Sequence, residues 1–222
     1  MQRTTLDFLR ELKRNNHRDW FSEHRPQYEA ALADFSEHVS ALITGTRKLH
    51  PDLGPLTPGD TIFRIFRDVR FAKDRTPYKP HFGAFIARGG RKGNRAGYYV
   101  HVEPGGDSMI AGGIYMPPPA ELKRLRETLA RDAKALRKIL AGKKFTQTFG
   151  GFTGEQLKTV PRGFAKDHPD ADLLKYKSFI VWRKLPDAAV LAKDNIKNTL
   201  SDFKLLQPLV DYLNAALDVN AS

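Results

Sequence analysis

The sequence contains no cysteine. This absence excludes disulfide bonds, zinc–thiolate sites and a cysteine nucleophile, and it is compatible with a reducing compartment. No apolar run approaches the roughly 18 residues that a membrane-spanning helix needs, and the first residues do not resemble a secretory signal peptide. We therefore expect a cytoplasmic protein with no membrane partner.

Internal repeats, low-complexity tracts and an obvious inter-domain linker are also missing. The 222 residues suffice for one large domain. Hydrophobic residues make up 41% of the chain and charged residues 28%, a balance typical of a globular protein with a real core. We expect a single domain over residues 1–222, and the sequence carries no indication of its oligomeric state.

Acidic residues are the minority among the charged ones. The chain has 37 Lys and Arg against 25 Asp and Glu, which gives a formal net charge of +12. Such a charge favours association with polyanions and can supply salt-sensitive affinity for nucleic acid. The alternative is that surface basicity only aids solubility.

The hydrophobic pattern changes period twice along the chain. It predicts helices, then β-strands, then helices again, which indicates an α+β fold. The predicted helices run from Thr4 or Thr5 to Asn15, around Trp20, from Pro26 to a stop at Gly45, from Pro117 to Gly142, and within 187–217. The predicted strands cover 61–66, 81–88, 97–103, 109–116 and 178–184. Short connections favour an antiparallel sheet of about four to five strands, packed with helices from both the N- and C-terminal parts.

Polar side chains alternate along one of these strands. Because side chains point to opposite faces in turn, Tyr99, His101 and Glu103 share one face of the strand over 97–103. If 61–71 lies in the same sheet, Arg64 and Arg70 extend this strip, and His81 is a further candidate. His101 and Glu103 suit a general acid/base pair or metal ligands. No H-E-x-x-H or similar spacing is present, so we predict no metal site, and no motif identifies a cofactor.

The segment from Arg64 to Lys79, RIFRDVRFAKDRTPYK, is the densest in charge. Guanidinium groups interleaved with aromatic residues suit binding of phosphate or carboxylate groups, but Asp68 and Asp74 can instead neutralise them as structural ion pairs. The hairpin tip at 88–95 is also basic and lacks the P-loop spacing. It is either a solvated turn or a contact for a nucleic-acid backbone.

The same segment resembles an uncharacterised family, domain of unknown function 2461 (DUF2461). Further stretches follow the family pattern: YYVHVEPG at 98–105, AGGIYMP at 111–117, and Leu157 through Pro161-Arg162-Gly163-Phe164 to His168-Pro169. The resemblance covers nearly the whole chain. It implies a single-domain cytoplasmic protein, with no agreed activity to carry over.

Three functional hypotheses remain open from the sequence. The first is a module that binds an anionic ligand, nucleic acid or a phosphorylated small molecule, through Arg64, Arg67, Arg70, Lys73, Lys79 and Tyr99. The second is an enzyme acting on a phosphate-bearing substrate, with His101 and Glu103 as acid and base. The third is a structural or regulatory protein without a ligand site.

Overall fold

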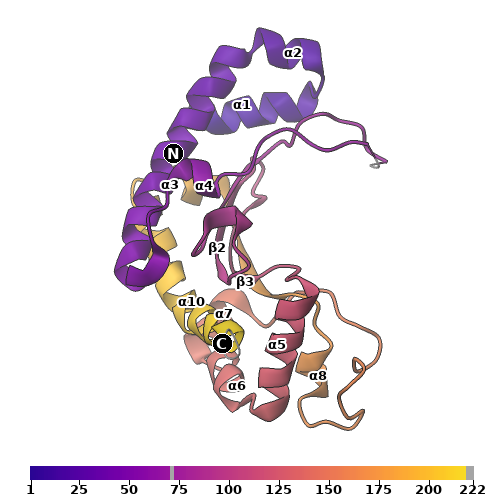
Figure 1. Ribbon diagram of the computed structural model, residues 1–222. Helices are drawn as coiled ribbons and strands as arrows, with labels where there is room; N and C mark the ends of the chain where they lie inside the picture. The colour runs from indigo at the N-terminus through magenta and orange to yellow at the C-terminus, as the bar shows by residue number, and fades with distance from the viewer. Residues whose placement is uncertain (71–72, 219–222) are drawn as a thin grey trace.

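The computed structural model describes residues 1–70 and 73–218 and has the outline of a letter C (Figure 1). A sheet forms the back of the C, and helical parts project from its two ends. The N-terminal part comprises α1 (Arg3–Arg14), α2 (Arg18–Glu23), α3 (Arg25–Leu49), η1 (Pro51–Leu53) and α4 (Pro58–Thr61). The C-terminal part comprises α5 (Pro119–Arg131), α6 (Lys134–Leu140), α7 (Lys143–Phe149), α8 (Ala171–Leu174), α9 (Asp187–Leu191) and α10 (Asn195–Asp218).

The sheet has four antiparallel strands in the order of the sequence. They are β1 (Phe82–Ile86), β2 (Gly97–Val102), β3 (Ser108–Ile114) and β4 (Phe179–Leu185). Each strand lies within two residues of a predicted segment, and helices from both parts of the chain pack on the sheet. The predicted α+β class is therefore confirmed.

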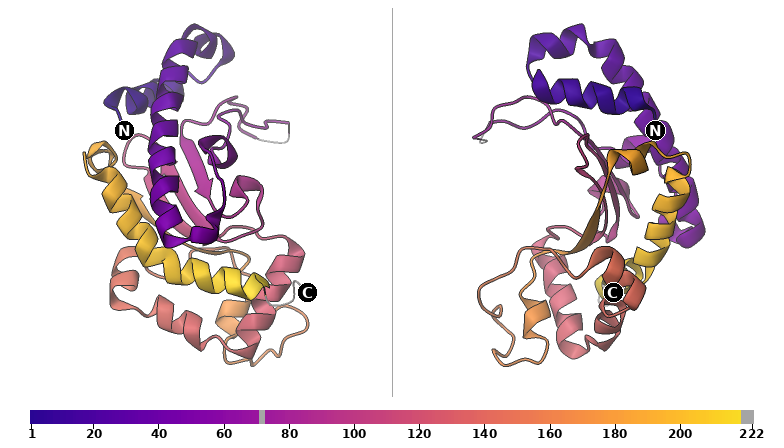
Figure 2. Two further views of the ribbon diagram at one scale, coloured as in Figure 1. Left: turned by 60° about the vertical axis from the view of Figure 1, so that its left-hand side comes forward. Right: turned by 180° about the vertical axis from the view of Figure 1, so that it is seen from behind.

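One face of the sheet is closed by α3 and α10, which run along it (Figure 2). Tyr98 stacks on Phe203 of α10 at 4.4 Å between ring centroids, and Phe82 stacks on Phe35 of α3 at 5.3 Å. All four rings are almost fully buried, and aromatic burial of this kind dominates core energetics. No helix within residues 1–70 and 73–218 covers the opposite face of the sheet (Figure 2).

The predicted strand at 61–66 is wrong. Thr61 still belongs to α4, and beyond it only isolated bridges form, at Ile62 with Ala84 and at Phe66 with Tyr78. Residues 62–63 bond to the edge of β1, whereas residues 65–67 pair with 77–79, so that the segments 64–70 and 73–80 form an arm that projects from the sheet (Figure 1). Proline has no N–H to donate, so Pro77 and Pro80 interrupt any continuous ladder along this arm.

Two predicted helix ends are also wrong. The helix that includes Gly45 continues to Leu49, because this glycine serves close packing: a Cβ there would come within 2.4 Å of Leu200 in α10. The helix predicted to reach Gly142 is divided into α5 and α6, since Asp132 leaves the helical conformation and its carboxylate accepts a hydrogen bond from the N–H of Lys134. Such side-chain capping competes with helix continuation.

The N-terminal helices anchor the arm at Tyr78. The side-chain amide of Asn16 donates to the Tyr78 carbonyl at 2.9 Å and accepts from the Tyr78 N–H at 3.1 Å. The Tyr78 ring stacks on Phe21 at 4.0 Å between centroids. Asn16 thus satisfies both backbone polar groups of Tyr78, as a neighbouring β-strand would otherwise do.

Acid is expected to destabilise the protein through His38 in α3. This side chain is buried, its Nδ1 lacks a hydrogen-bond partner, and burial, together with the N-terminal charge, lowers its pKa from 6.5 to about 4. Between pH 6.5 and about 4 the unfolded chain therefore binds a proton that the folded protein excludes, so stability falls as pH decreases across this window. Full protonation costs about 3 kcal/mol.

Urea unfolding at pH 7 and pH 4.5 measures this effect. His38→Leu should lose less unfolding free energy than the unaltered protein over that interval. Part of the pH dependence of the unfolding free energy should persist in His38→Leu, because the pKa of His81 is also lowered to about 4. Equal slopes in both proteins would contradict the role of His38.

Candidate functional site

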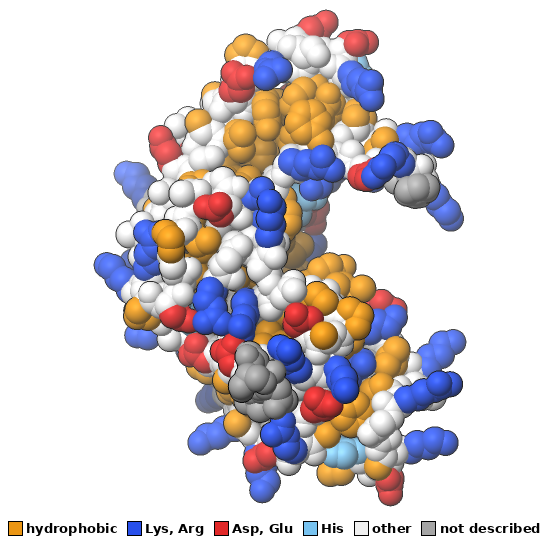
Figure 3. Space-filling model, viewed as in Figure 1, with side chains coloured by type: hydrophobic (Ala, Val, Ile, Leu, Met, Phe, Trp, Pro, Cys, Tyr) orange, Lys and Arg blue, Asp and Glu red, His pale blue; other side chains and the backbone are white. Residues whose placement is uncertain are grey.

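The uncovered face of the sheet forms the floor of a cleft of about 820 Å³. Figure 3 shows the molecule hollowed on this side, between the arm and the C-terminal helices. The volume lies within the range of about 300–1,000 Å³ that is usual for small-molecule sites. We therefore treat this cleft as the candidate functional site.

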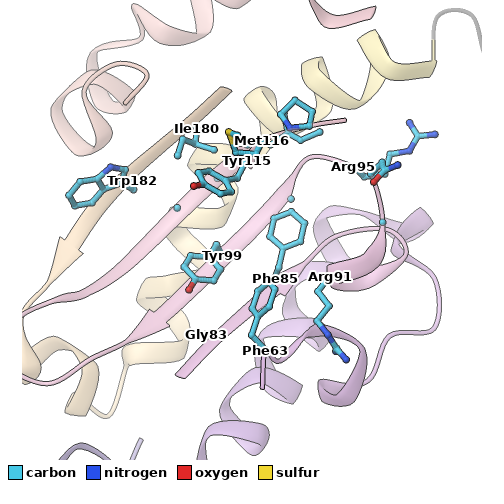
Figure 4. A pocket seen from close by; sticks show the side chains of 18 of the residues that line it. Phe63, Gly83, Phe85, Arg91, Arg95, Tyr99, Tyr115, Met116, Ile180 and Trp182 are labelled. Atoms are coloured by element: carbon cyan, nitrogen blue, oxygen red, sulfur yellow. The ribbon is translucent and has the colours of Figure 1, made fainter. Parts of the chain in front are cut away.

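Strand register arranges the floor in three rows. The middle row runs Phe85, Tyr99, Ala111 and Trp182 across β1 to β4, and Figure 4 shows its three aromatic rings extending from different strands. The rows on either side contain Gly83 and Met109, and Gly97, Gly113 and Ile180. Ala111 is the small residue between Tyr99 and Trp182, and it leaves space for a flat group there. The glycines of the outer rows leave no such space: a Cβ at Gly83 would meet the Tyr99 hydroxyl at 2.5 Å, and one at Gly97 the Ile86 carbonyl oxygen at 2.5 Å.

Gly113 can be replaced by no other residue without strain. Its φ is +122°, and a Cβ there would lie 2.0 Å from the carbonyl oxygen of Phe179. Gly112, next to it, faces α10, where a Cβ would come within 2.9 Å of Leu206. Both glycines therefore lie where the backbone of β3 closely approaches a neighbouring element.

Cationic side chains line the cleft beside its aromatic floor. Lys79 donates to the carbonyl oxygen of Arg64 at 2.9 Å and lies 5.9 Å from the centroid of the Phe63 ring. Arg91 donates to the carbonyl of Gly59, whereas Arg95 pairs with Asp218. Within residues 1–70 and 73–218, Lys79, Arg91 and Lys92 form no ion pair, so their charges are available to an anion.

The hairpin tip carries three of these cations. Instead of a free solvated turn, Gly90–Lys92 forms the short helix η2, which packs on α4. A Cβ at Gly90 would lie 2.5 Å from the carbonyl oxygen of Asp60. This close approach places Arg91 at the edge of the cleft, beside Phe63 and Phe85 (Figure 4).

The structure separates the cations of the arm from those of the cleft. Arg70 forms a two-pronged pair with Asp68, at 3.0 and 2.7 Å, and Arg67 pairs with Asp74 and Thr76. Arg64 and Lys73 are exposed on the arm. Of the six residues predicted to bind an anion, only Lys79 and Tyr99 line the cleft.

A chain of hydrogen bonds links the polar residues of β2. The Tyr99 hydroxyl lies 3.1 Å from His101 Nδ1, and His101 Nε2 lies 3.0 Å from Glu103 Oε2. Lys13 of α1 donates to the other carboxylate oxygen at 2.9 Å. His81 joins them, with its ring centroid 4.1 Å from that of His101. The predicted strip therefore contains Tyr99, His101, Glu103 and His81, while Arg64 and Arg70 lie outside it.

Burial and neighbouring charges tune these groups. Burial and the charge of His101 lower the pKa of His81 to about 4. Burial alone would raise the pKa of Glu103, but hydrogen bonds and charges from Lys13 and His101 lower it below its ordinary value. Burial and the charge of Glu103 raise the pKa of Tyr99 to about 12. At neutral pH the cluster thus offers a neutral imidazole, a carboxylate and a protonated phenol.

Two large apolar side chains on the wall next to β3 are unusually exposed to solvent. Tyr115 is 73% exposed and Met116 is 54% exposed. Met116 has a φ of +44°, and its N–H donates to the Ser178 hydroxyl at 2.8 Å. A strained, solvent-exposed apolar residue beside a cleft is typical of a binding site.

Sequence reasoning missed several lining residues, among them Phe63, Phe85, Tyr115 and Trp182, and it considered Arg91 only as part of the basic tip at 88–95. A signal was present for Phe85, which alternates with the buried residues of its strand. None was present for the approach of Trp182, since β4 follows β3 by some 64 residues and only their pairing brings it to the cleft.

Comparison with known proteins gives a family and no activity. No curated protein and no solved structure matches the chain. Among the described residues, no helix is both long and apolar enough to span a membrane. The family DUF2461, described as a conserved hypothetical protein, matches residues 4–212. That match spans almost the entire sequence, and the chain belongs to the DUF2461 family.

Proposed function

We propose that this protein binds a phosphorylated small molecule with a planar ring, of the nucleotide class, in the cleft on the uncovered face of the sheet. The observation that carries the proposal is the position of Lys79 and Arg91 beside the aromatic floor formed by Phe85, Tyr99 and Trp182. Aromatic faces stack with planar rings, and uncompensated cations bind phosphate.

The size of the cleft favours a small molecule over a polymer. Its walls enclose the floor on the arm side and on the side of Tyr115. The net charge of +12 raises the local concentration of any polyanion, but such a long-range attraction does not select a ring. The stacking surface supplies that selection.

A titration with adenosine 5′-monophosphate tests the proposal. Trp20 packs on His24 in α2, away from the cleft, so Trp20→Phe leaves Trp182 as the sole fluorescent tryptophan. We expect quenching by the nucleotide and weaker binding of adenosine or inorganic phosphate alone. Lys79→Ala and Arg91→Ala should each weaken binding by about tenfold, the value of one charge-assisted hydrogen bond.

Arg70→Ala is the matched control for these variants. Its guanidinium is already paired with Asp68 in the arm, so affinity should stay unchanged. An equal loss in Arg70→Ala would move the anion site to the arm. Salt-dependent binding of a single-stranded oligonucleotide, with no binding of purine or pyrimidine monophosphates, would favour a nucleic-acid partner instead.

A second candidate function is acid–base catalysis on a phosphate-bearing substrate. The contact between His101 and Glu103, directly behind the lining residues His81 and Tyr99, favours it. In this case Glu103 orients the imidazole through Nε2, and His101 exchanges a proton through Nδ1 with a substrate group that replaces the Tyr99 hydroxyl. Chemical conversion of a bound nucleotide, lost in Glu103→Gln with binding retained, would support catalysis, and unchanged probe after prolonged incubation would argue against it.

A further inference from the structure

Three potential metal ligands meet where β1 and β2 adjoin the arm. One nitrogen each of His81 and His101 and one carboxylate oxygen of Glu103 lie within 4.8 Å of one another. His81 directly precedes β1, His101 lies on β2, and Glu103 directly follows the end of β2. The sequence places His81 some 20 residues from His101, a spacing that matches no metal motif.

The separations approach those of a coordinated ion. His101 Nε2 and Glu103 Oε2 are 3.0 Å apart, and His81 Nδ1 is 3.8 Å from the same oxygen. Donors about 2.1 Å from a tetrahedral ion lie about 3.3 Å from each other. Small side-chain rotations therefore suffice to close the three donors around one ion.

The groups behind these donors are arranged as second-shell partners usually are. When His101 Nε2 binds an ion, its Nδ1 carries the proton and donates it to the Tyr99 oxygen 3.1 Å away. Lys13 holds Oε1 of Glu103, which leaves Oε2 turned toward the two histidines. His101 and Glu103 are thus each oriented by a partner of their own.

The donor set also fixes the class of ion. Two imidazole nitrogens and one carboxylate oxygen suit Zn²⁺ and related divalent transition metals, and they disfavour Mg²⁺ and Ca²⁺, which prefer all-oxygen ligands. His81 lines the cleft. A fourth coordination position would therefore be open on the cleft side, where water or a ligand atom can occupy it.

We infer that His81, His101 and Glu103 form a binding site for a divalent transition metal ion at the arm end of the cleft. The site binds the ion in the absence of any organic ligand. It is therefore independent of the nucleotide binding proposed above, and either can fail without the other, whereas the acid–base alternative uses the same His101 and Glu103.

Calorimetric titration of the full chain with ZnCl₂, after treatment with EDTA, tests the site. We expect one ion per chain and a rise in melting temperature on zinc addition. CoCl₂ should give visible d–d absorption of a low-symmetry site. His81→Asn and Glu103→Gln should each weaken zinc binding by roughly tenfold or more.

Two kinds of control make the result decisive. His17→Ser removes an exposed histidine and retains a side chain that can cap α2, so its zinc affinity should equal that of the unaltered protein. Melting curves in EDTA establish that Glu103→Gln is folded. Absence of zinc binding in the unaltered protein, or equal affinity in folded His81→Asn and Glu103→Gln, would overturn the inference. Retention of zinc binding in Lys79→Ala would separate this site from the phosphate site.

Discussion

Ala111→Phe is expected to weaken nucleotide binding strongly while the protein stays folded. Ala111 lies between Tyr99 and Trp182 in the middle row of the floor. A benzyl group at this position enters the cleft and occupies the slot in which we place the planar ring. We expect affinity for adenosine 5′-monophosphate to fall by about 100-fold, equivalent to roughly 2.7 kcal/mol of binding free energy.

Ala111→Ser is the control, because serine is close in size to alanine. This variant should bind adenosine 5′-monophosphate with little change in affinity. Both variants should keep the unfolding free energy within about 1 kcal/mol of the unaltered protein, because the new side chain extends into open volume and not into the core. Measured binding in Ala111→Phe equal to that of the unaltered protein would show that the ligand lies elsewhere.

Gly113→Ala is expected to cost about 3 kcal/mol of unfolding free energy or more. Two costs add at this position. A φ of +122° is strained for any residue with a side chain, and a methyl group there would meet the Phe179 carbonyl oxygen at 2.0 Å. That oxygen belongs to the β3–β4 ladder, so the strands must separate locally to make room. Equilibrium urea unfolding measures the loss.

Gly151→Ala is the control for the loss of glycine alone. Nothing lies within 4 Å of a Cβ at Gly151, and its φ is not in the left-handed region. The same substitution there should leave stability unchanged or raise it by about 0.4–1 kcal/mol through the unfolded state. A loss in Gly113→Ala no larger than in Gly151→Ala would refute the packing argument.

The elements that were predictable from the sequence are those with strong local patterns. The two-residue period of β2 is enough to place Tyr99, His101 and Glu103 on one face, and the structure connects them by hydrogen bonds. Helical periodicity likewise finds α1 and α3. These patterns depend only on neighbouring residues.

The wrong predictions lie where contacts between segments far apart in the sequence determine the structure. The residues 61–66 have strand propensity, yet prolines at 77 and 80 limit their pairing to isolated bridges. Glycine often ends a helix, but Gly45 lies inside α3 and packs against Leu200 of α10. The arginines of the arm look like an anion site until Asp68 and Asp74 are seen to pair with them. In each case tertiary contacts override local preference.

The hydrogen bonds between Asn16 and Tyr78 couple the chain's beginning to a wall of the cleft. Lys79, the next residue after Tyr78, therefore owes its position to a segment that never touches the cleft. A protease cut or truncation that removes α1 and Asn16 would release the base of the arm. Lys79 would then no longer be held beside the cleft, although every lining side chain is still present. Recombinant fragments intended for ligand screening must accordingly retain the first helix.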